Sequence, residues 1–196
     1  SMSVVNMLYN WQLMRMLGTN GVAAYGVIMY VNFIFISIFI GYSMGSAPVV
    51  GYHYGAGNKD ELKNLFKKSI RLILAMGVIL TIAAELLNRP LSRIFVSYDK
   101  DLLEMTIYAF GVYAVSFLIM GINIYASSFF TALNDGFTSA MISFCRTLIF
   151  EVAAVLLLPV ILGPKGIWFA VLAAEIFALL LSIFFLVRNR KKYSYI

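Results

Sequence analysis

Long uninterrupted apolar runs constrain this chain more than any other feature. A bilayer span needs about 20 mostly apolar residues. Five runs meet that need, at about residues 23–52, 69–87, 103–128, 138–162 and 167–187. Only 12% of the 196 residues are charged, against about 25% in a soluble domain, so polar groups cannot cover the surface. Lipid must cover it instead, and the sequence predicts an all-α integral membrane protein.

The first 17 residues are apolar but too short to span a bilayer, and they include Asn6, Asn10 and Arg15. An interfacial helix is one interpretation. We favour the second half of a truncated span, because the turn residues Gly18–Gly21 follow directly. The prediction is therefore one membrane domain over residues 1–196. Its six helices lie at about residues 2–17, 23–52, 62–87, 103–128, 138–162 and 167–187.

The basic residues indicate the orientation of the chain in the membrane. Residues 55–71 hold five Lys or Arg and the tail after residue 187 holds four, whereas the opposite side holds five that are diluted by acidic residues. Cytoplasmic segments carry the excess of basic residues, so we expect this loop and the C-terminus to be cytoplasmic. The net charge of +6 then reflects topology signals and lipid headgroup contacts, and no nucleic acid partner is expected.

The stretch APVVGYHYGAGN, residues 47–58, follows glycines spaced four apart at Gly41 and Gly45. Small residues at this spacing allow close helix packing in lipid, so Gly41, Gly45 and Gly51 are predicted packing positions. Pro48 is predicted to bend the helix. The stretch contains neither GxxxxGK[ST] nor GxGxxG, which argues against a phosphate loop, and Asn58 is predicted to cap the next helix.

Charged residues inside the predicted spans are candidates for function, because charge at membrane depth is expensive. They are Arg146 and Glu151 in the fifth predicted helix, Glu175 in the sixth, and Glu85 near the outer end of the third. We expect Arg146 and Glu175 to be partnered charges, whereas Glu151 is open between a buried proton carrier and a structural partner. Interhelical hydrogen bonds are expected for the span asparagines, Asn6, Asn10, Asn32 and Asn123.

The sequence does not support an enzyme or a metal site. It contains one cysteine and one histidine, Cys145 and His53, so it cannot build a Cys/His metal cluster or an internal disulfide. Neither a Ser/His/Asp set nor a Cys/His set is present. No cofactor is expected.

Three stretches together suggest a family. APVVGYHYGAGN (residues 47–58), MRMLGTNGVAAYGV (14–27) and ALNDGFTSAMISFCRTLIF (132–150) run in the same order as in multidrug and toxic compound extrusion (MATE) transporters. The chain resembles the C-terminal half of that family, with LLLPVILGPKGIWFAVLAAEI (156–176) similar to its eleventh-to-twelfth helix region.

The resemblance implies a six-helix lobe, helices seven to twelve with the seventh truncated, of a two-lobe transporter in the bacterial cell membrane. It also implies efflux of organic, often cationic, compounds in exchange for H⁺ or Na⁺ by alternating access. The expected partners are the bilayer, an N-terminal lobe or a second copy, and small organic cations. The expected cavity lining is Asn6, Asn10, Tyr30, Phe33, Tyr113, Phe117 and Met120.

The chain departs from the family pattern at several positions, since His53 stands where the family often has Asn and Ala47 replaces a common Gln. Some members carry coupling carboxylates on the seventh and tenth helices, but residues 1–17 hold none and residues 103–128 hold only Glu104, at the outer edge. No coupling-ion residue is therefore carried over. Two alternatives remain: a flippase for lipid-linked precursors or polysaccharides, and a non-transporting half-protein that dimerises or serves as an accessory subunit.

Overall fold

The computed structural model describes residues 2–196, apart from the side chain of Met2, and this part of the chain is built of helices without a strand. The helices are α1 (Met2–Gly55), α2 (Lys59–Val96), α3 (Lys100–Ala114), α4 (Phe117–Ala132), α5 (Gly136–Phe144), α6 (Glu151–Leu162) and α7 (Ala170–Tyr193). A π-helical segment, η1 (Cys145–Phe150), joins α5 to α6, and a 3₁₀ segment, η2 (Pro164–Phe169), joins α6 to α7. The predicted all-α fold is confirmed.

Two breaks shape the spans. α1 consists of two helices that meet at Gly18, whose φ of 67° and ψ of −156° glycine adopts without steric cost. α3 and α4 are bent by 46° relative to each other at a short break. By length and composition, four helical stretches are able to cross a membrane, or five if this bent pair is counted as one span.

Side-chain caps fix where several helices begin. Asn58 accepts a hydrogen bond from the Glu61 N–H at the start of α2, as the sequence predicts. Asp135 accepts one from the Thr138 N–H at the start of α5. Each cap satisfies an N–H group that has no partner within its helix, and so makes the short polar connections fold tightly.

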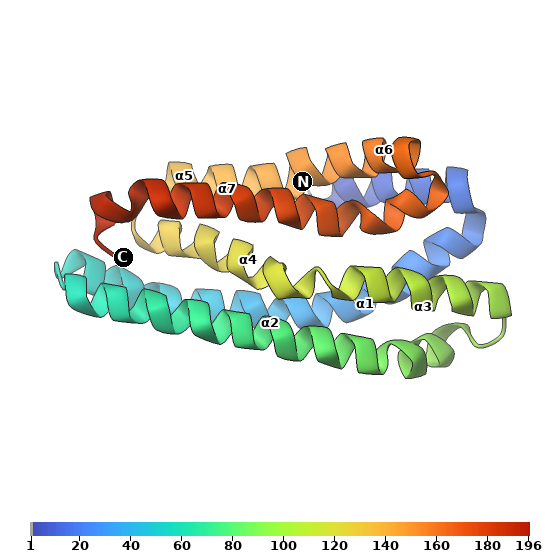
Figure 1. Cartoon of the computed structure of the whole chain (residues 1–196), viewed down its shortest axis with the longest axis horizontal. Coiled ribbons are helices and arrows are strands. Elements are labelled where there is room, and N and C mark those ends of the chain that lie inside the picture. The colour runs from blue at the N-terminus through green and yellow to red at the C-terminus, as the bar shows by residue number, and fades with distance from the viewer. Residues whose placement is uncertain (1) are drawn as a thin grey trace.

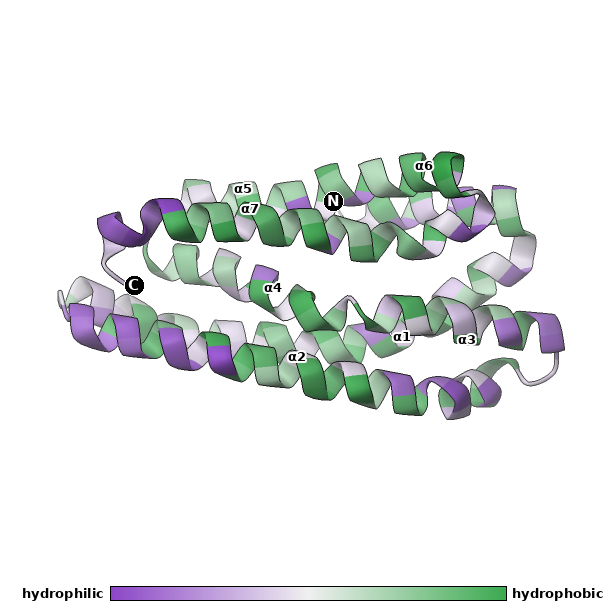
Figure 2. Ribbon diagram, in the orientation of Figure 1, coloured by the Kyte–Doolittle hydropathy of each residue, from purple (hydrophilic) through white to green (hydrophobic). Residues whose placement is uncertain are grey.

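The helices lie side by side along one long axis in two groups (Figure 1). α5, η1, α6 and α7 form one group, and α2, α3 and the long second part of α1 form the other. α4 lies between the groups and packs against α1, α2, α5 and α7. The middle of the bundle is hydrophobic and both ends are more hydrophilic, as expected for a chain that crosses a membrane (Figure 2).

Close helix packing does occur at glycines, but not at the predicted ones. A Cβ added to Gly41 or Gly45 would meet no atom within 4 Å, and one added to Gly51 would only touch the Ala132 carbonyl at 3.4 Å. The predicted packing role of Gly41 and Gly45 is therefore wrong for contacts within this chain, since their face of α1 is solvent- or lipid-exposed. Close approaches lie at other glycines, among them Gly77 of α2, where a Cβ would come within 3.0 Å of the Leu118 carbonyl oxygen.

Pro48 does not interrupt α1. It lies inside α1, and Gly18 is the one residue of α1 with non-helical backbone angles. Pro48 is exposed, so the carbonyl group that loses its hydrogen-bond donor lies on the outer face of the helix. The helix therefore continues through Pro48 without a break, and the bend there stays a prediction.

α2 extends beyond its predicted limits of residues 62–87, because polar residues at its second end find partners. Asn88 is buried and donates a hydrogen bond to the Ile107 carbonyl of α3 at 2.8 Å. Ser92 donates to the Asn88 side chain at 3.3 Å. The helix therefore continues through Asn88 and Pro90 to Val96, where the sequence suggested a loop.

Candidate functional site

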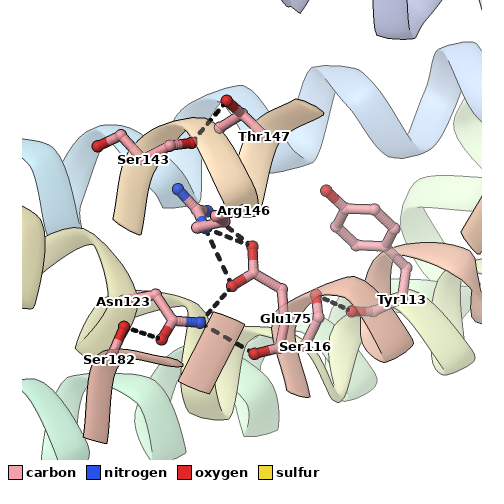
Figure 3. A network of polar contacts seen from close by, with 8 residues as sticks. All are labelled: Tyr113, Ser116, Asn123, Ser143, Arg146, Thr147, Glu175 and Ser182. Carbon is pink, nitrogen blue, oxygen red and sulfur yellow. Dashed lines mark hydrogen bonds and ion pairs between the residues drawn. The ribbon is translucent and has the colours of Figure 1, made fainter. Parts of the chain in front are cut away.

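A buried ion pair joins η1 to α7 (Figure 3). The Arg146 guanidinium on η1 donates from Nε to both carboxylate oxygens of Glu175 on α7, at 2.8 and 3.1 Å, and its Nη2 lies 2.7 Å from Oε1. The exposed fractions of the two side chains are 14% and 6%. Such a two-pronged arrangement is the strong form of an arginine–carboxylate contact, and it neutralises both charges within the bundle.

Asn123 on α4 completes this network. Its Nδ2 donates to Glu175 Oε2 at 2.7 Å and to the Glu175 carbonyl oxygen at 3.0 Å, and its Oδ1 accepts from Ser182 Oγ at 3.0 Å. Asn123, Glu175 and Ser182 are all buried. The network therefore ties α4, η1 and α7 together through hydrogen bonds that leave few buried polar groups unpaired, as burial of charge requires.

The π-helical segment η1 changes which side chains share a face. In an α-helix, residues five apart do not lie above one another, so Arg146 and Glu151 would point apart. In a π-helix the hydrogen bonds run from i to i+5, and the wider turn brings residues five apart onto one side. Arg146, Thr147 and Glu151 accordingly line the same cavity. This shared face cannot be predicted from α-helical spacing.

That cavity, which we call the carboxylate cavity, has a volume of about 210 Å³. α1, α3, α4, η1 and the first residue of α6 contribute to it. Its lining is Val5, Asn6, Tyr25, Met29, Asn32, Phe33, Ile36, Tyr113, Met120, Arg146, Thr147 and Glu151. Polar groups are thus placed among aromatic and methionine side chains, the usual composition of a small-molecule site.

Glu151 gives the carboxylate cavity its net charge. Arg146 is balanced by Glu175, and in the part of the chain that the structure describes no basic side chain lies within 4.0 Å of the Glu151 carboxylate. One unbalanced carboxylate therefore faces the cavity. Asn32 Oδ1 is buried there and accepts no hydrogen bond from the described residues, so a second oxygen is left free for a ligand.

A larger groove continues from the carboxylate cavity and shares Asn6, Tyr25, Met29 and Phe33 with it. This aromatic groove has a volume of about 810 Å³ and is also lined by Asn10, Val22, Gly26, Tyr30, Ile34 and Phe95. Tyr30 of α1 stacks on Phe95 of α2 with ring centroids 6.2 Å apart. Flat apolar molecules fit against such faces.

A hydroxyl-lined cavity of about 360 Å³ lies beside the ion pair, and Arg146 lines it as well as the carboxylate cavity. Ser127 Oγ on α4 lies 2.6 Å from Ser143 Oγ on α5. Ser43 is 2% exposed, and its Oγ has no partner among the described residues. Arg146 therefore separates two polar cavities within the bundle.

The structure places the predicted cavity residues in three environments. Asn6, Phe33, Tyr113 and Met120 line the carboxylate cavity, and Asn10 and Tyr30 line only the aromatic groove. Phe117 is fully buried at the start of α4, where its ring packs against Phe35 and Tyr113 at centroid distances of 5.1 and 5.7 Å. Its predicted cavity role is wrong, because the bend between α3 and α4 turns it into the core.

Tyr25 and Met29 line both the carboxylate cavity and the aromatic groove and were missed from the sequence. With Phe33 they are spaced four residues apart along one helix, so they share a face. The spacing in the sequence therefore indicates that Tyr25 and Met29 share the face of Phe33. No group of three or more His, Cys, Asp or Glu side chains suited to a metal ion occurs within residues 2–196.

Comparisons with known proteins bear on this geometry. The MatE family model matches residues 1–156. The probable multidrug resistance protein YoeA of Bacillus subtilis (strain 168) is 27% identical over 154 residues, which are 78% of this chain and 32% of that protein.

Solved structures share the fold. The MATE transporter VcmN of Vibrio cholerae, in its bent form, has a TM-score of 0.87 at 18% identity, over 97% of this chain and 43% of VcmN. A transporter of the MOP superfamily from Pyrococcus furiosus, described as having a binding pocket of reverse polarity, gives 0.85 at 19% identity, over 98% of this chain and 43% of that one. The chain thus spans about a third of its curated relative and less than half of these structures.

Proposed function

This chain belongs to the MatE family of transporters, and from that premise we propose that it forms the C-terminal lobe of a multidrug efflux antiporter. A partner lobe of similar size would complete the transport pathway, in keeping with the 43% share of the VcmN chain that it covers. Transporters built from two repeated halves commonly bind their substrate between the halves. We place this lobe in a bacterial cell membrane, with its C-terminus cytoplasmic because of its basic residues.

The observation that carries the proposal is the unbalanced Glu151 carboxylate in a cavity with aromatic and methionine walls. A buried carboxylate without a partner attracts a cation. Aromatic faces such as those of Tyr25 and Tyr113 attract cations through their ring quadrupoles, and Met29 and Met120 adapt to ligand shape. We therefore propose organic cations with flat apolar parts as substrates, with the apolar part lying in the aromatic groove.

The same carboxylate can couple transport to an ion gradient. A substrate cation and H⁺ or Na⁺ neutralise Glu151 equally well, and a single carboxylate cannot serve both at once. Binding of one therefore favours release of the other. If the occupied cavity opens to one side of the membrane and then to the other, the substrate cation is exchanged for H⁺ or Na⁺. Asn32 Oδ1 beside Glu151 offers an additional oxygen for Na⁺, so the proposal includes both ions.

Imposed gradients test the proposal. The complete transporter is reconstituted in vesicles, and efflux of a fluorescent organic cation is measured under a pH gradient and, separately, under a Na⁺ gradient. We expect one gradient to drive efflux and Glu151→Gln to abolish the driven part. Efflux that responds to neither gradient would overturn antiport.

Of the alternatives, the flippase is not favoured. Recognition of a diphosphate-linked lipid needs an excess of positive charge in the cavity. The one basic side chain of the carboxylate cavity, Arg146, is neutralised by Glu175, and Glu151 adds a negative charge.

A further inference from the structure

A basic pocket lies at the end of the bundle that holds the C-terminus, and it shares no lining residue with the carboxylate cavity. Its volume is about 190 Å³. We call it the lysine pocket. It is lined by His53, Tyr54, Gly57, Asn58, Lys59, Leu62, Lys191, Lys192, Tyr193 and Ser194. Figure 2 shows that the start of α2 and the end of α7 are the hydrophilic parts of this end of the molecule.

The lining carries three lysines and no carboxylate. Lys192 Nζ has a distant acidic neighbour outside the lining, Asp135 Oδ2 at 3.8 Å, and lies 4.6 Å from the centre of the Tyr193 ring. Within residues 2–196, Lys59 and Lys191 have no carboxylate within 4.0 Å. Two uncompensated ammonium groups from opposite parts of the chain therefore converge on one small volume.

Helix stability alone does not account for this convergence. Lys191 and Lys192 lie in the last turn of α7, where positive charge favours the helix dipole. Lys59 is the first residue of α2, however, where positive charge is unfavourable to the dipole. An anion in the pocket would offset that cost, because it would lie near both the Lys59 ammonium and the positive end of α2.

The donors that face the pocket are side chains and not loop amides. The N–H groups of Ala56, Gly57 and Asn58 donate to carbonyl oxygens of α1, at 2.9 to 3.1 Å, so this glycine-rich turn has no amides left for an anion. His53 Nδ1, by contrast, is buried and has no hydrogen-bond partner among the described residues. His53 therefore adds an unpaired ring nitrogen to the lining that holds the three ammonium groups.

We propose that the lysine pocket binds a phosphate group. A phosphate oxygen cluster accepts charge-assisted hydrogen bonds from several lysines at once. Basic pockets between transmembrane helices at a membrane surface are suited to anionic lipid headgroups. The phosphate comes either from a phospholipid headgroup or from inorganic phosphate in solution, and the two sources share this chemistry.

Paired variants of equal charge test the site in the complete protein. Lys59→Gln with Lys191→Gln removes two lysines of the pocket. Lys67→Gln with Lys68→Gln removes two exposed lysines of the same helix end that do not line it. Retention of phosphatidylglycerol is measured by native mass spectrometry. We expect the pocket variant to weaken it by about tenfold per lysine, from the usual strength of charged hydrogen bonds, and the control to change it far less.

Amine labelling identifies the source of the phosphate. Reaction of Lys59 and Lys191 with an amine reagent is mapped by mass spectrometry in phosphatidylcholine nanodiscs, with either phosphatidylglycerol or inorganic phosphate added. Protection by phosphatidylglycerol alone identifies a lipid headgroup site, and protection by both identifies a general phosphate site. The absence of protection by either, or equal lipid loss in both variant pairs, would overturn the proposal. Neither readout depends on transport, so failure here is distinct from failure of the proposed function.

Discussion

Glu175 holds Arg146 through both of its carboxylate oxygens, at 2.8 and 3.1 Å from Nε, across the contact between α7 and η1. This pair leaves Glu151 as the only charge of the carboxylate cavity that is not balanced within the described chain. The pair thus determines the sign of the net charge in the carboxylate cavity. Without Glu175, the unpaired positive charge of Arg146 would face the same cavity as Glu151, and the attraction for a cation would fall.

Glu175→Gln should destabilise the fold strongly. Removing one partner of a buried ion pair leaves an uncompensated charge, which costs about 3–5 kcal/mol. In Glu175→Gln, the uncompensated charge is the guanidinium of Arg146. We expect a lower melting temperature in detergent, measured by intrinsic tryptophan fluorescence.

The matched control replaces both partners, as Arg146→Met with Glu175→Leu, because apolar pairs of similar volume are often neutral for stability. Recovery of the melting temperature in the double variant is expected. A double variant as unstable as Glu175→Gln would show that the ion pair is not the source of the effect.

Glu151→Gln should remove cation binding while leaving the fold intact. Glu151 pairs with no basic side chain of the described chain, so its loss breaks no ion pair. Loss of a charged partner weakens binding by about tenfold or more. Binding of a fluorescent organic cation to the complete transporter measures this, with Thr147→Val as a control in the same cavity. Unchanged affinity in Glu151→Gln would remove Glu151 from the substrate site.

Local signals in the sequence were enough to predict most of the fold. Apolar runs located the spans, because lipid requires about 20 such residues for each. Gly18 and Asn58 marked a helix break and a helix start through backbone freedom and capping, which depend only on neighbouring residues. Asn88 and Pro90 looked like a loop, since the partner that keeps Asn88 in a helix, the Ile107 carbonyl, lies on another helix.

The candidate site was harder to predict from the sequence, because its geometry also depends on contacts between helices. Arg146, Glu151 and Glu175 were found because charge in a span is costly, but their arrangement depends on the π-helical turn of η1. That turn follows from packing and is not encoded in local spacing. Phe117 was misplaced because the bend between α3 and α4, rather than periodicity, decides where its ring points.

Asp135 should make the fold sensitive to acid. Burial alone would raise the pKa of its carboxyl group, but hydrogen bonds from Tyr193 and Thr138 and the nearby charge of Lys192 outweigh burial and hold the pKa below its usual value. The stabilisation is therefore complete above the unfolded pKa, about 4, and is lost as the pH falls through the lower folded pKa. We expect the melting temperature to fall below about pH 4.

Tyr193→Phe provides the control for this acid effect. It removes the hydrogen bond to Asp135 Oδ2, at 2.7 Å, so the folded pKa rises and less stability remains to be lost in acid. Asp135→Asn should remove most of this pH dependence and the charged cap of α5. An acid transition that is unchanged in Asp135→Asn would assign the loss to other carboxyl groups.

Gly77→Ala and Gly45→Ala should change stability in different directions. At Gly77 the added Cβ would lie 3.0 Å from the Leu118 carbonyl oxygen, and because that atom is backbone, α4 must move. Overpacking of this kind costs about 1–3 kcal/mol. At Gly45 no atom lies within 4 Å, so alanine only removes the conformational cost of a helical glycine, about 1 kcal/mol. Melting temperatures of the two variants of the complete transporter measure the difference. Destabilisation at Gly45 as large as at Gly77 would mean that another lobe packs on this face of α1. The four-residue spacing of small residues predicts such a close contact. Within the described part of this chain, no helix makes that contact at Gly45.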